Sequence, residues 1–402
     1  MNDMSIDDLF NVFSAKYARI GVQFVRSIEQ EIEWKAPLIG IQGARGVGKT
    51  TLLLQHARLH HKLDGTTLYA SVDNIWFNAH SIYELATAFS QRGGRYLFLD
   101  EVHKYANWSQ ELKNIYDDLP DLHVVFTGSS LLEILNSRAD LSRRAIVYEM
   151  QGFSFREYLN WNESLTLPRV TLEQLLGGHV AIATETLRQV KVLQHFDAYL
   201  RHGYYPFYKE MPALFSSRLS EVVNMVLEIE IPQLRDVETS YIPKMKQLLY
   251  IIAESAPFVP NISKLSERIG LSRNALLQYL NALHDSRITF SLQKESAGVA
   301  RLQKPDKLYL DNTNLAYALI GLQPNVGTLR ETFFANQLRY QHEVNLAVQG
   351  DFVVDHRFTF EVGGAGKGSK QIAAVENAYV VADNIEYGNG KHIPLWMFGM
   401  LY

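Results

Sequence analysis

The sequence predicts an α/β fold in which a parallel sheet is followed by a mainly helical region and then by smaller domains. Two observations lead to this prediction. Between residues 36 and 150, short apolar runs alternate with helical segments, a pattern typical of βαβ units. A glycine-rich loop also joins the first apolar run to a helical segment, as ligand-binding loops at the edge of such a sheet do. At 402 residues, the chain is long enough for about two to three domains.

The elements follow in order along the chain. Residues 1–35 are expected to be helical, because apolar side chains recur there at spacings of three and four. The apolar runs of the sheet predict strands at residues 38–42, 67–71, 96–100, 123–127 and 145–149. The expected divisions are an N-terminal helical segment at 1–35, a sheet-containing core at 36–150, a helical region at 151–255, two short helices with a hairpin at 256–310, and a mixed α/β domain at 311–402.

The composition excludes several classes of site. The chain has no cysteine, which rules out disulfides, thiolate metal sites and a cysteine nucleophile, and favours a reducing cytosol. Its net charge of −4 supplies no overall field toward nucleic acid or anionic lipid, so such binding needs a local patch. The acidic start lacks the features of a signal peptide, and the apolar stretches are shorter than the roughly 20 residues that span a bilayer. We therefore expect a cytoplasmic protein with no membrane partner.

The strongest motif is the loop GARGVGKT at residues 43–50, which matches the pattern G-x-x-x-x-G-K-[ST]. It lies between the strand-like PLIGIQ and the helix-like TTLLLQHARL, the context that phosphate binding requires. Glycines allow main-chain N–H groups to converge on phosphate oxygens, and the helix N-terminus adds a favourable dipole. We expect Lys49 to neutralise the β- and γ-phosphates and the Thr50 hydroxyl to ligate Mg²⁺. The residues expected at bound ATP in this region are Gly43, Ala44, Arg45, Gly46, Val47, Gly48, Lys49, Thr50 and Thr51.

An acidic pair ends the strand-like segment RYLFLDE at residues 95–101. Because the carboxyl end of a buried parallel strand lies beside the phosphate loop, we expect Asp100 to hold Mg²⁺ through water and Glu101 to activate the attacking water. An isolated Asp-Glu pair would instead be a solvated strand end. At the end of the next strand, Thr127 and Ser129 are expected to sense the γ-phosphate or position the water; the alternative is that they cap the following helix.

Together these segments resemble the AAA-type ATPases of bacteria and archaea, in particular the AAA+/STAND-like P-loop group with a winged helix and a PD-(D/E)xK nuclease-like domain at the carboxyl end. The resemblance covers nearly the whole chain and rests on GARGVGKTTLL, YLFLDEVHKYANWSQELKNIYD, VVFTGSSLLEI, LSRRAIVYEMQGFSFREYL and IPLWMFGMLY.

The resemblance implies that residues 151–255 form a lid over the nucleotide. It also implies that Arg143 or Arg144 reaches the γ-phosphate of a neighbouring subunit in a homo-oligomer. The alternative is that these arginines pair with surface carboxylates, since the group also resembles ATPases that act as monomeric switches.

Residues 261–283 are typical of a helix-turn-helix, and residues 288–310 of the β-wing that completes a winged helix. Between residues 261 and 310, eight basic residues outnumber four acidic ones, a local excess that contact with duplex DNA needs. The side chains expected at the DNA are Arg273, Asn274, Gln278, Lys294 and Lys304. The alternative is a packing or protein-partner module, because winged helices in ATPases also serve those roles.

In the last domain, Asp351 and Glu361 fit the metal-binding acids of the PD-(D/E)xK nuclease fold, and Glu331 on a preceding helix is a further candidate ligand. Glycine occupies position 363, where that fold has its lysine. Lys367 in the following glycine-rich stretch could replace it, but the sequence shows nothing that would order this side chain. We therefore expect a degenerate restriction-endonuclease-like α/β domain kept for structure or recognition, with an active nuclease as the alternative.

The sequence thus predicts a Mg²⁺-dependent ATPase that couples its nucleotide state to conformational change of the winged-helix and carboxyl-terminal domains. The alternative from the binding class is a nucleotide-gated switch for DNA or a protein partner, in which slow hydrolysis only resets the switch. Both hypotheses keep ATP and Mg²⁺ as ligands of the same loop and acidic pair.

Overall fold

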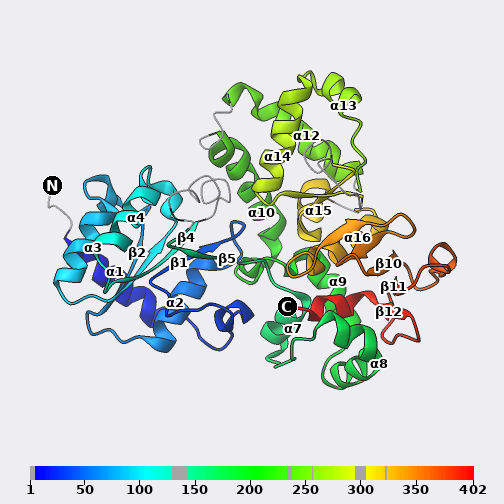
Figure 1. The fold of residues 1–402 in the computed structure, drawn as a ribbon, viewed down its shortest axis with the longest axis horizontal. Coiled ribbons are helices and arrows are strands. Elements are labelled where there is room, and N and C mark those ends of the chain that lie inside the picture. The colour runs from blue at the N-terminus through cyan, green and yellow to red at the C-terminus, as the bar shows by residue number, and fades with distance from the viewer. Residues whose placement is uncertain are drawn as a thin grey trace. The chain divides into compact units, whose positions relative to one another are not determined.

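The computed structural model describes residues 5–128, 141, 143–232, 238–255, 257–294, 305–321 and 324–402 (Figure 1). The chain forms two compact units, which divide between Gly152 and Phe153. Within the described residues, no helix combines the length and apolar character that crossing a membrane demands.

The first unit is built on a five-stranded sheet with the order β2-β3-β4-β1-β5. Every neighbouring pair of strands is parallel, which confirms the predicted parallel sheet. Strand β1 lies inside the sheet, and its Gly40 faces the ring of Phe126 on β4 so closely that a Cβ would crowd the ring. The strands are β1 (Leu38–Gln42), β2 (Thr67–Ser71), β3 (Tyr96–Asp100), β4 (His123–Gly128) and β5 (Ile146–Glu149).

Helices cover both faces of this sheet, which explains why β1, β2, β3 and β4 are buried along nearly their whole length. Figure 1 shows α2 and α4 on opposite sides of the strands. Helix α1 packs against β2, where Phe13 stacks on Tyr69 with ring centroids 6.3 Å apart. The helical segments, with short 3₁₀ and π turns labelled η, are α1 (Ile6–Arg19), η1 (Ser27–Gln30), α2 (Lys49–His60), η2 (Ile75–Asn78), α3 (Ile82–Gln91), η3 (Val102–Lys104) and α4 (Trp108–Asp118).

The second unit begins with helices whose core includes the end of the chain. Ser154 caps α7: its hydroxyl accepts from the Glu157 N–H at 3.1 Å and donates to the Tyr402 main-chain oxygen at 2.6 Å. Phe196 on α9 packs edge to face against Phe155 of α7 and against Phe333 of α16 (Val326–Leu338). The helical segments here are α7 (Phe155–Glu163), α8 (Leu172–Gln189), α9 (Val192–Ala198), η4 (Tyr199–Gly203), η5 (Pro206–Lys209), η6 (Pro212–Leu214), α10 (Phe215–Met225), η7 (Val226–Glu230), η8 (Thr239–Tyr241) and α12 (Ile242–Ser255).

Two short helices and an antiparallel strand pair follow, as the sequence pattern predicted. Helix α13 (Ile262–Ile269) ends at Gly270 with φ +69°, and Ser272 caps α14 (Arg273–Asp285). Strands β6 (Thr289–Leu292) and β7 (Lys307–Leu310) pair antiparallel. The apolar sides of the two helices are buried, including Leu265 and Leu276.

The carboxyl-terminal sheet has the order β12-β11-β10-β9-β8. Strands β8, β9 and β10 pair antiparallel, whereas β10, β11 and β12 pair parallel. Phe334 of the buried helix α16 contacts the rings of Phe360 on β10 and Phe398. The elements are α15 (Thr313–Ile320), α16 (Val326–Leu338), β8 (Val344–Leu346), β9 (Phe352–Val354), β10 (Phe358–Gly363), η10 (Lys370–Ile372), β11 (Ala378–Ala382), β12 (His392–Pro394) and η11 (Leu395–Met400).

Candidate nucleotide site

The glycine-rich loop between β1 and α2 needs glycine for its conformation. Gly46 and Gly48 have φ angles of +86° and +102°, which side-chain-bearing residues rarely adopt. A Cβ on Gly43 would overlap the carbonyl oxygen of Met150. Lys49 Nζ donates to the carbonyl oxygens of Gly43 at 2.8 Å and Ala44 at 2.9 Å. The ammonium group is therefore held against the loop that the motif assigns to phosphates.

A buried arginine from the N-terminal segment supports this loop. Arg26 donates to the carbonyl oxygen of Val47 at 2.9 Å and to the carbonyl oxygens of Gln151 at 2.8 Å and Gly152 at 2.9 Å. Both Arg26 and Val47 are buried. The guanidinium thus ties the phosphate loop to the residues that follow β5.

Asp100 ends β3 and is the most densely hydrogen-bonded group of the site, with 2% of its surface exposed. Its carboxylate accepts from the hydroxyls of Thr50 at 2.7 Å and Tyr69 at 2.7 Å. The hydroxyl of Thr127 also donates to it, and accepts from the Glu101 N–H at 3.0 Å. The phosphate loop, strand β2 and the end of β4 therefore each contribute a hydroxyl that hydrogen-bonds to the Asp100 carboxylate.

Glu101 follows Asp100 with a left-handed backbone, φ +59°. Its carboxylate lies 3.6 Å from Lys104 Nζ and 3.7 Å from His103 Nε2. Burial raises the pKa of Glu101, the neighbouring Asp100 charge adds to this, and Lys49 opposes it. Burial, together with Lys49 and Lys104, lowers the pKa of His103 to about 3, so this ring is neutral. A carboxylate with a raised pKa is suited to accept a proton.

A pocket of about 380 Å³ opens beside these groups. It is lined by Arg45 and Thr50 from the loop region, by Asp100 and Glu101, and by residues of α1 and of β2 with the turn that follows it. Polar groups of opposite charge therefore surround one cavity at the carboxyl edge of a parallel sheet, where open α/β sheets bind ligands.

Three further predicted residues of the first unit, Thr51, Arg143 and Arg144, have exposed or half-buried side chains. Thr51 is exposed on α2, next to Thr50. Arg144 forms two hydrogen bonds to Asp117 at 2.9 Å each, whereas Arg143 is exposed. Ser129 lies outside the described residues. Among the two arginines, the structure therefore pairs Arg144 with a carboxylate of its own chain.

Four of the five residues predicted at DNA have surface positions. Arg273, Asn274 and Gln278 are exposed on α14, and Lys294 is exposed beyond β6. Lys304 lies outside the described residues.

The predicted acids of the last domain meet across neighbouring strands. The N–H of Val362 donates to Asp351 at 2.8 Å, and Glu361 on β10 is buried. Burial raises the pKa of Asp351 to about 6, and the charges of Glu331 and Glu361 add to this. Glu331 accepts from Lys307 Nζ at 2.8 Å and from the Tyr309 hydroxyl at 2.7 Å.

The expectation that nothing orders Lys367 is wrong. Its Nζ lies 2.5 Å from Glu361 Oε1. Its aliphatic stem packs against Gly363 so closely that a Cβ there would come within 2.5–2.8 Å of three of its carbons. The absence of a side chain at Gly363 leaves the room that this lysine occupies.

Sequence reasoning missed Arg26 and Tyr69 as parts of the nucleotide site. Tyr69 stands inside an apolar strand and Arg26 in a segment with no motif, so neither carries a local signal. Only strand pairing could have indicated Tyr69, because β2 lies next to β3 and Ser71 pairs with Asp100 in the register.

Comparison with known proteins agrees with the geometry of the first unit. Residues 35–159 match a family described as AAA domain (AAA_14), and residues 193–326 match a domain of unknown function (DUF8612). An uncharacterized protein of Methanocaldococcus jannaschii, MJ1637, is 26% identical over 289 residues. That match covers 68% of this chain and 60% of the relative, so the chain spans about three fifths of the length of the relative.

Solved structures resemble the whole chain only weakly. The Walker-type ATPase paby2304 of Pyrococcus abyssi is 12% identical, with 74% of this chain and 96% of that chain covered and a TM-score of 0.41. AMPPCP-bound DnaA from Aquifex aeolicus is 14% identical, with 64% and 84% covered and a TM-score of 0.27. Residues 35–159 match the AAA domain family, and the parallel sheet, the glycine-rich loop and the acidic pair of the first unit agree with a nucleotide-binding P-loop domain.

Proposed function

We propose that the chain is a Mg²⁺-dependent ATPase that hydrolyses ATP in the pocket of its first unit. The observation that supports this most directly is the 2.7 Å hydrogen bond from the Thr50 hydroxyl to Asp100. It brings together a hydroxyl and a carboxylate, the oxygen donors that hold Mg²⁺ in P-loop ATPases. Lys49, held beside them, supplies the positive charge that β- and γ-phosphates require.

In this proposal, each side chain has a separate task. Lys49 exchanges its carbonyl partners for phosphate oxygens. Thr127 holds the Asp100 carboxylate and the Glu101 main chain, so that the Glu101 side chain can accept the proton of the attacking water. Mg²⁺, where bound by Thr50 and Asp100, supplies charge that stabilises the phosphates during transfer. The raised pKa of Glu101 makes it a stronger base than an exposed carboxylate.

The test compares phosphate release from Mg-ATP by the wild type and by Glu101→Gln. We expect the variant to bind ATP with unchanged affinity and to lose turnover by about 10²-fold or more, because the amide cannot take the proton. Glu376→Gln, at an exposed glutamate of the second unit, is the matched control and should keep full turnover. Equal turnover in the wild type and Glu101→Gln would overturn the assignment of Glu101.

We further propose that Arg143, rather than Arg144, completes the site of a neighbouring subunit. Arg143 is exposed, whereas Arg144 already binds Asp117. The specific ATPase activity should then rise with protein concentration. It should also fall in Arg143→Ala, by up to about 10³–10⁵-fold, which is the contribution of such arginines in other ATPases. Constant activity across the concentration series would instead support a monomeric switch.

The proposal also includes coupling of the nucleotide state to the second unit and contact with duplex DNA through α14. The exposed polar side chains of α14 and the local excess of basic residues support DNA contact. Gel shifts with and without ATP should show nucleotide-dependent affinity, which Arg273→Ala weakens. No affinity for duplex DNA in either state would remove this part of the proposal.

Metal-dependent cleavage of nucleic acid in the second unit is a second candidate function. The observation that favours it is the ion pair of Lys367 with Glu361, because the ammonium group is then held beside the acids despite glycine at position 363. We expect Mg²⁺- or Mn²⁺-dependent cleavage that Lys367→Ala abolishes and Lys370→Ala, at a nearby exposed lysine, preserves. No cleavage of duplex, single-stranded or branched DNA would contradict this candidate.

A further inference from the structure

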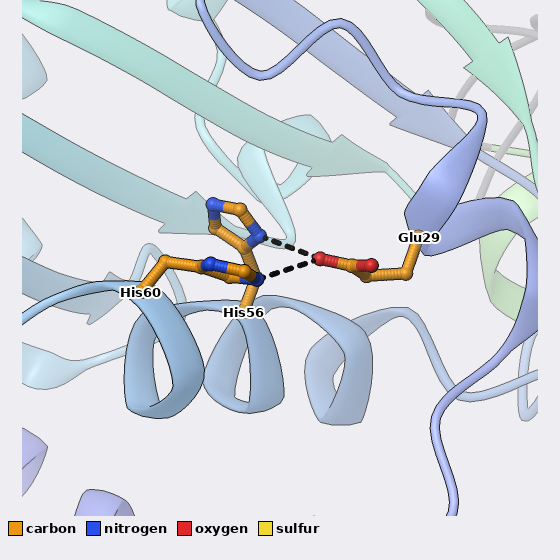
Figure 2. A group of neighbouring side chains, drawn as sticks. All are labelled: Glu29, His56 and His60. Carbon is orange, nitrogen blue, oxygen red and sulfur yellow. Dashed lines mark hydrogen bonds and ion pairs between the residues drawn. The ribbon is translucent and has the colours of Figure 1, made fainter.

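Three side chains converge near the C-terminal end of helix α2, away from the phosphate loop. His56 and His60 lie one helical turn apart, so both rings project from the same side of α2. Glu29 comes from the short turn η1. Figure 2 shows both imidazole rings directed at the same carboxylate oxygen: His56 Nδ1 is 3.2 Å and His60 Nε2 is 3.0 Å from Glu29 Oε1. All three donor atoms lie within 4.8 Å of one another.

Two of the three groups are held in place by packing. His56 is 5% exposed and stacks on Trp34, with ring centroids 3.5 Å apart and an angle of 14°. The indole N–H of Trp34 donates to the carbonyl oxygen of Glu29 at 2.8 Å, which fixes the turn that carries the carboxylate. His60 is half exposed and faces solvent. Glu29 and His56 are therefore held in position, and a ligand could reach them from the side of His60.

The space next to these groups is large enough for a bound ion and its water. A pocket of about 590 Å³ is lined by the three side chains together with Trp34, His61 and His123.

We propose that Glu29, His56 and His60 form a binding site for a divalent transition-metal ion of the Zn²⁺ class. Two imidazoles and one carboxylate are a donor set that suits Zn²⁺ and leaves a fourth position for water on the side of the pocket. With metal–ligand bonds of about 2.0–2.1 Å in a tetrahedral site, neighbouring donor atoms stand roughly 3.3 Å apart. The two measured separations from the carboxylate oxygen are close to this value.

This site is separate from the one that holds Mg²⁺ in the proposed ATPase. Thr50 lies in the first turn of α2 and the two histidines lie six and ten residues further on, which places them about 9–15 Å from Thr50 along the helix axis. The donors also differ, since Mg²⁺ prefers oxygen ligands and borderline ions prefer imidazole. The site would join the N-terminal segment to α2 and should stabilise the first unit without taking part in ATP chemistry.

Titration of the full-length, untagged and chelator-treated protein with Zn²⁺ in the absence of nucleotide tests the proposal. We expect one saturable Zn²⁺ ion per chain and an increase in Tm on binding. His60→Gln, at a half-exposed position, and the isosteric Glu29→Gln should each weaken binding by tenfold or more and abolish the increase in Tm. His80→Gln, which removes a histidine elsewhere in the first unit, should bind as the wild type does.

A second measurement reports on the geometry. Paramagnetic Co²⁺ should quench the fluorescence of Trp34, because this ring stacks on His56. The quenching should disappear in both His60→Gln and Trp34→Phe. Unchanged ATP turnover in His60→Gln would show that this variant is folded. The metal site would be overturned if the wild type showed no saturable Zn²⁺ binding. It would also be overturned if the wild type, His60→Gln and Glu29→Gln bound Zn²⁺ with equal affinity. A loss of affinity in His80→Gln as large as that in His60→Gln would have the same consequence.

Discussion

Asp100 shows how single residues organise the nucleotide site. Its carboxylate is buried and accepts hydrogen bonds from the hydroxyls of Thr50, Tyr69 and Thr127, which come from the loop, from β2 and from β4. Hydrogen bonds to a buried charge contribute more than those between neutral groups, so these hydroxyls determine where the carboxylate lies. Burial and the Asp100 charge together raise the pKa of Tyr69, which keeps this phenol a donor.

Thr127→Val tests whether this hydroxyl positions the acidic pair. The change removes the donor to Asp100 and the acceptor of the Glu101 N–H, at a cost of about 1–3 kcal/mol for the unpaired groups. We expect turnover of ATP to fall by at least tenfold while the affinity for ATP changes little, measured by steady-state phosphate release and by nucleotide titration. Thr166→Val, at an exposed threonine of the second unit, is the control and should keep full turnover. Full turnover in Thr127→Val would contradict this role.

Arg26 and Arg58 allow a comparison between a buried and an exposed arginine that both bind main-chain carbonyl oxygens. Arg26 binds three carbonyl oxygens in a buried setting, and Arg58 binds three carbonyl oxygens at the surface. Removing the buried guanidinium leaves polar groups without water. We expect Arg26→Met to lower the free energy of unfolding by about 2–4 kcal/mol and Arg58→Met by less than about 1 kcal/mol, measured by urea denaturation. Equal losses would show that burial does not determine the cost.

At the scale of elements, helix caps connect local sequence to packing. Ser154 and Thr171 both form capping boxes, at the starts of α7 and α8. The two caps differ in their surroundings, because Ser154 is buried and also binds the main-chain oxygen of Tyr402, whereas Thr171 is exposed. The cap at Thr171 therefore stabilises only the start of its own helix. The cap at Ser154 also connects its helix to residue 402 of the same unit.

Alanine at each cap should separate these two contributions. Thr171→Ala loses one cap and should reduce the free energy of unfolding by about 1 kcal/mol. Ser154→Ala also leaves the buried Tyr402 oxygen with one partner fewer, and should reduce it by about 2–3 kcal/mol. Calorimetry or urea denaturation of both variants gives the comparison. A smaller loss for Ser154→Ala than for Thr171→Ala would show that the contact with Tyr402 contributes nothing.

At the scale of the whole molecule, each unit depends on contacts between distant segments. In the second unit, His284 of α14 lies near Arg287, Arg339 and Asp311. Arg339 pairs with Asp311 and stands over the ring of Phe290 on β6. His284 of α14 and three charged residues that follow it in the sequence, Arg287, Asp311 and Arg339, thus form one largely buried cluster. Burial lowers the pKa of His284 to about 4, and the two arginines add to the effect.

The low pKa of His284 predicts a loss of stability in acid. The unfolded chain binds the proton with a pKa near 6.5, so the contribution is complete above that value and is lost as the pH falls toward 4. The loss amounts to about 3 kcal/mol at most. His284→Gln should therefore flatten the fall of Tm between pH 6.5 and 4 relative to the wild type, and His356→Gln, at an exposed histidine, should leave it unchanged. Parallel pH profiles for the wild type and His284→Gln would contradict this assignment.

The parallel sheet of the first unit could be predicted from the sequence alone, and so could the positions of the phosphate-loop motif and of the acidic pair in the chain. Strand-length apolar runs, the spacing of Gly43, Lys49 and Thr50, and the position of Asp100 at a strand end are short-range signals. They follow from main-chain geometry and from the chemistry of phosphate, and need no knowledge of distant contacts.

The groups that surround these motifs depend on how distant segments of the chain pack together. Tyr69 reaches Asp100 because β2 pairs with β3, and Lys367 reaches Glu361 because Gly363 leaves room for its stem. Glu29 meets His56 and His60 because the N-terminal segment packs on α2. Each of these contacts joins residues whose separation in the sequence carries no periodic or motif signal, so packing alone brings them together.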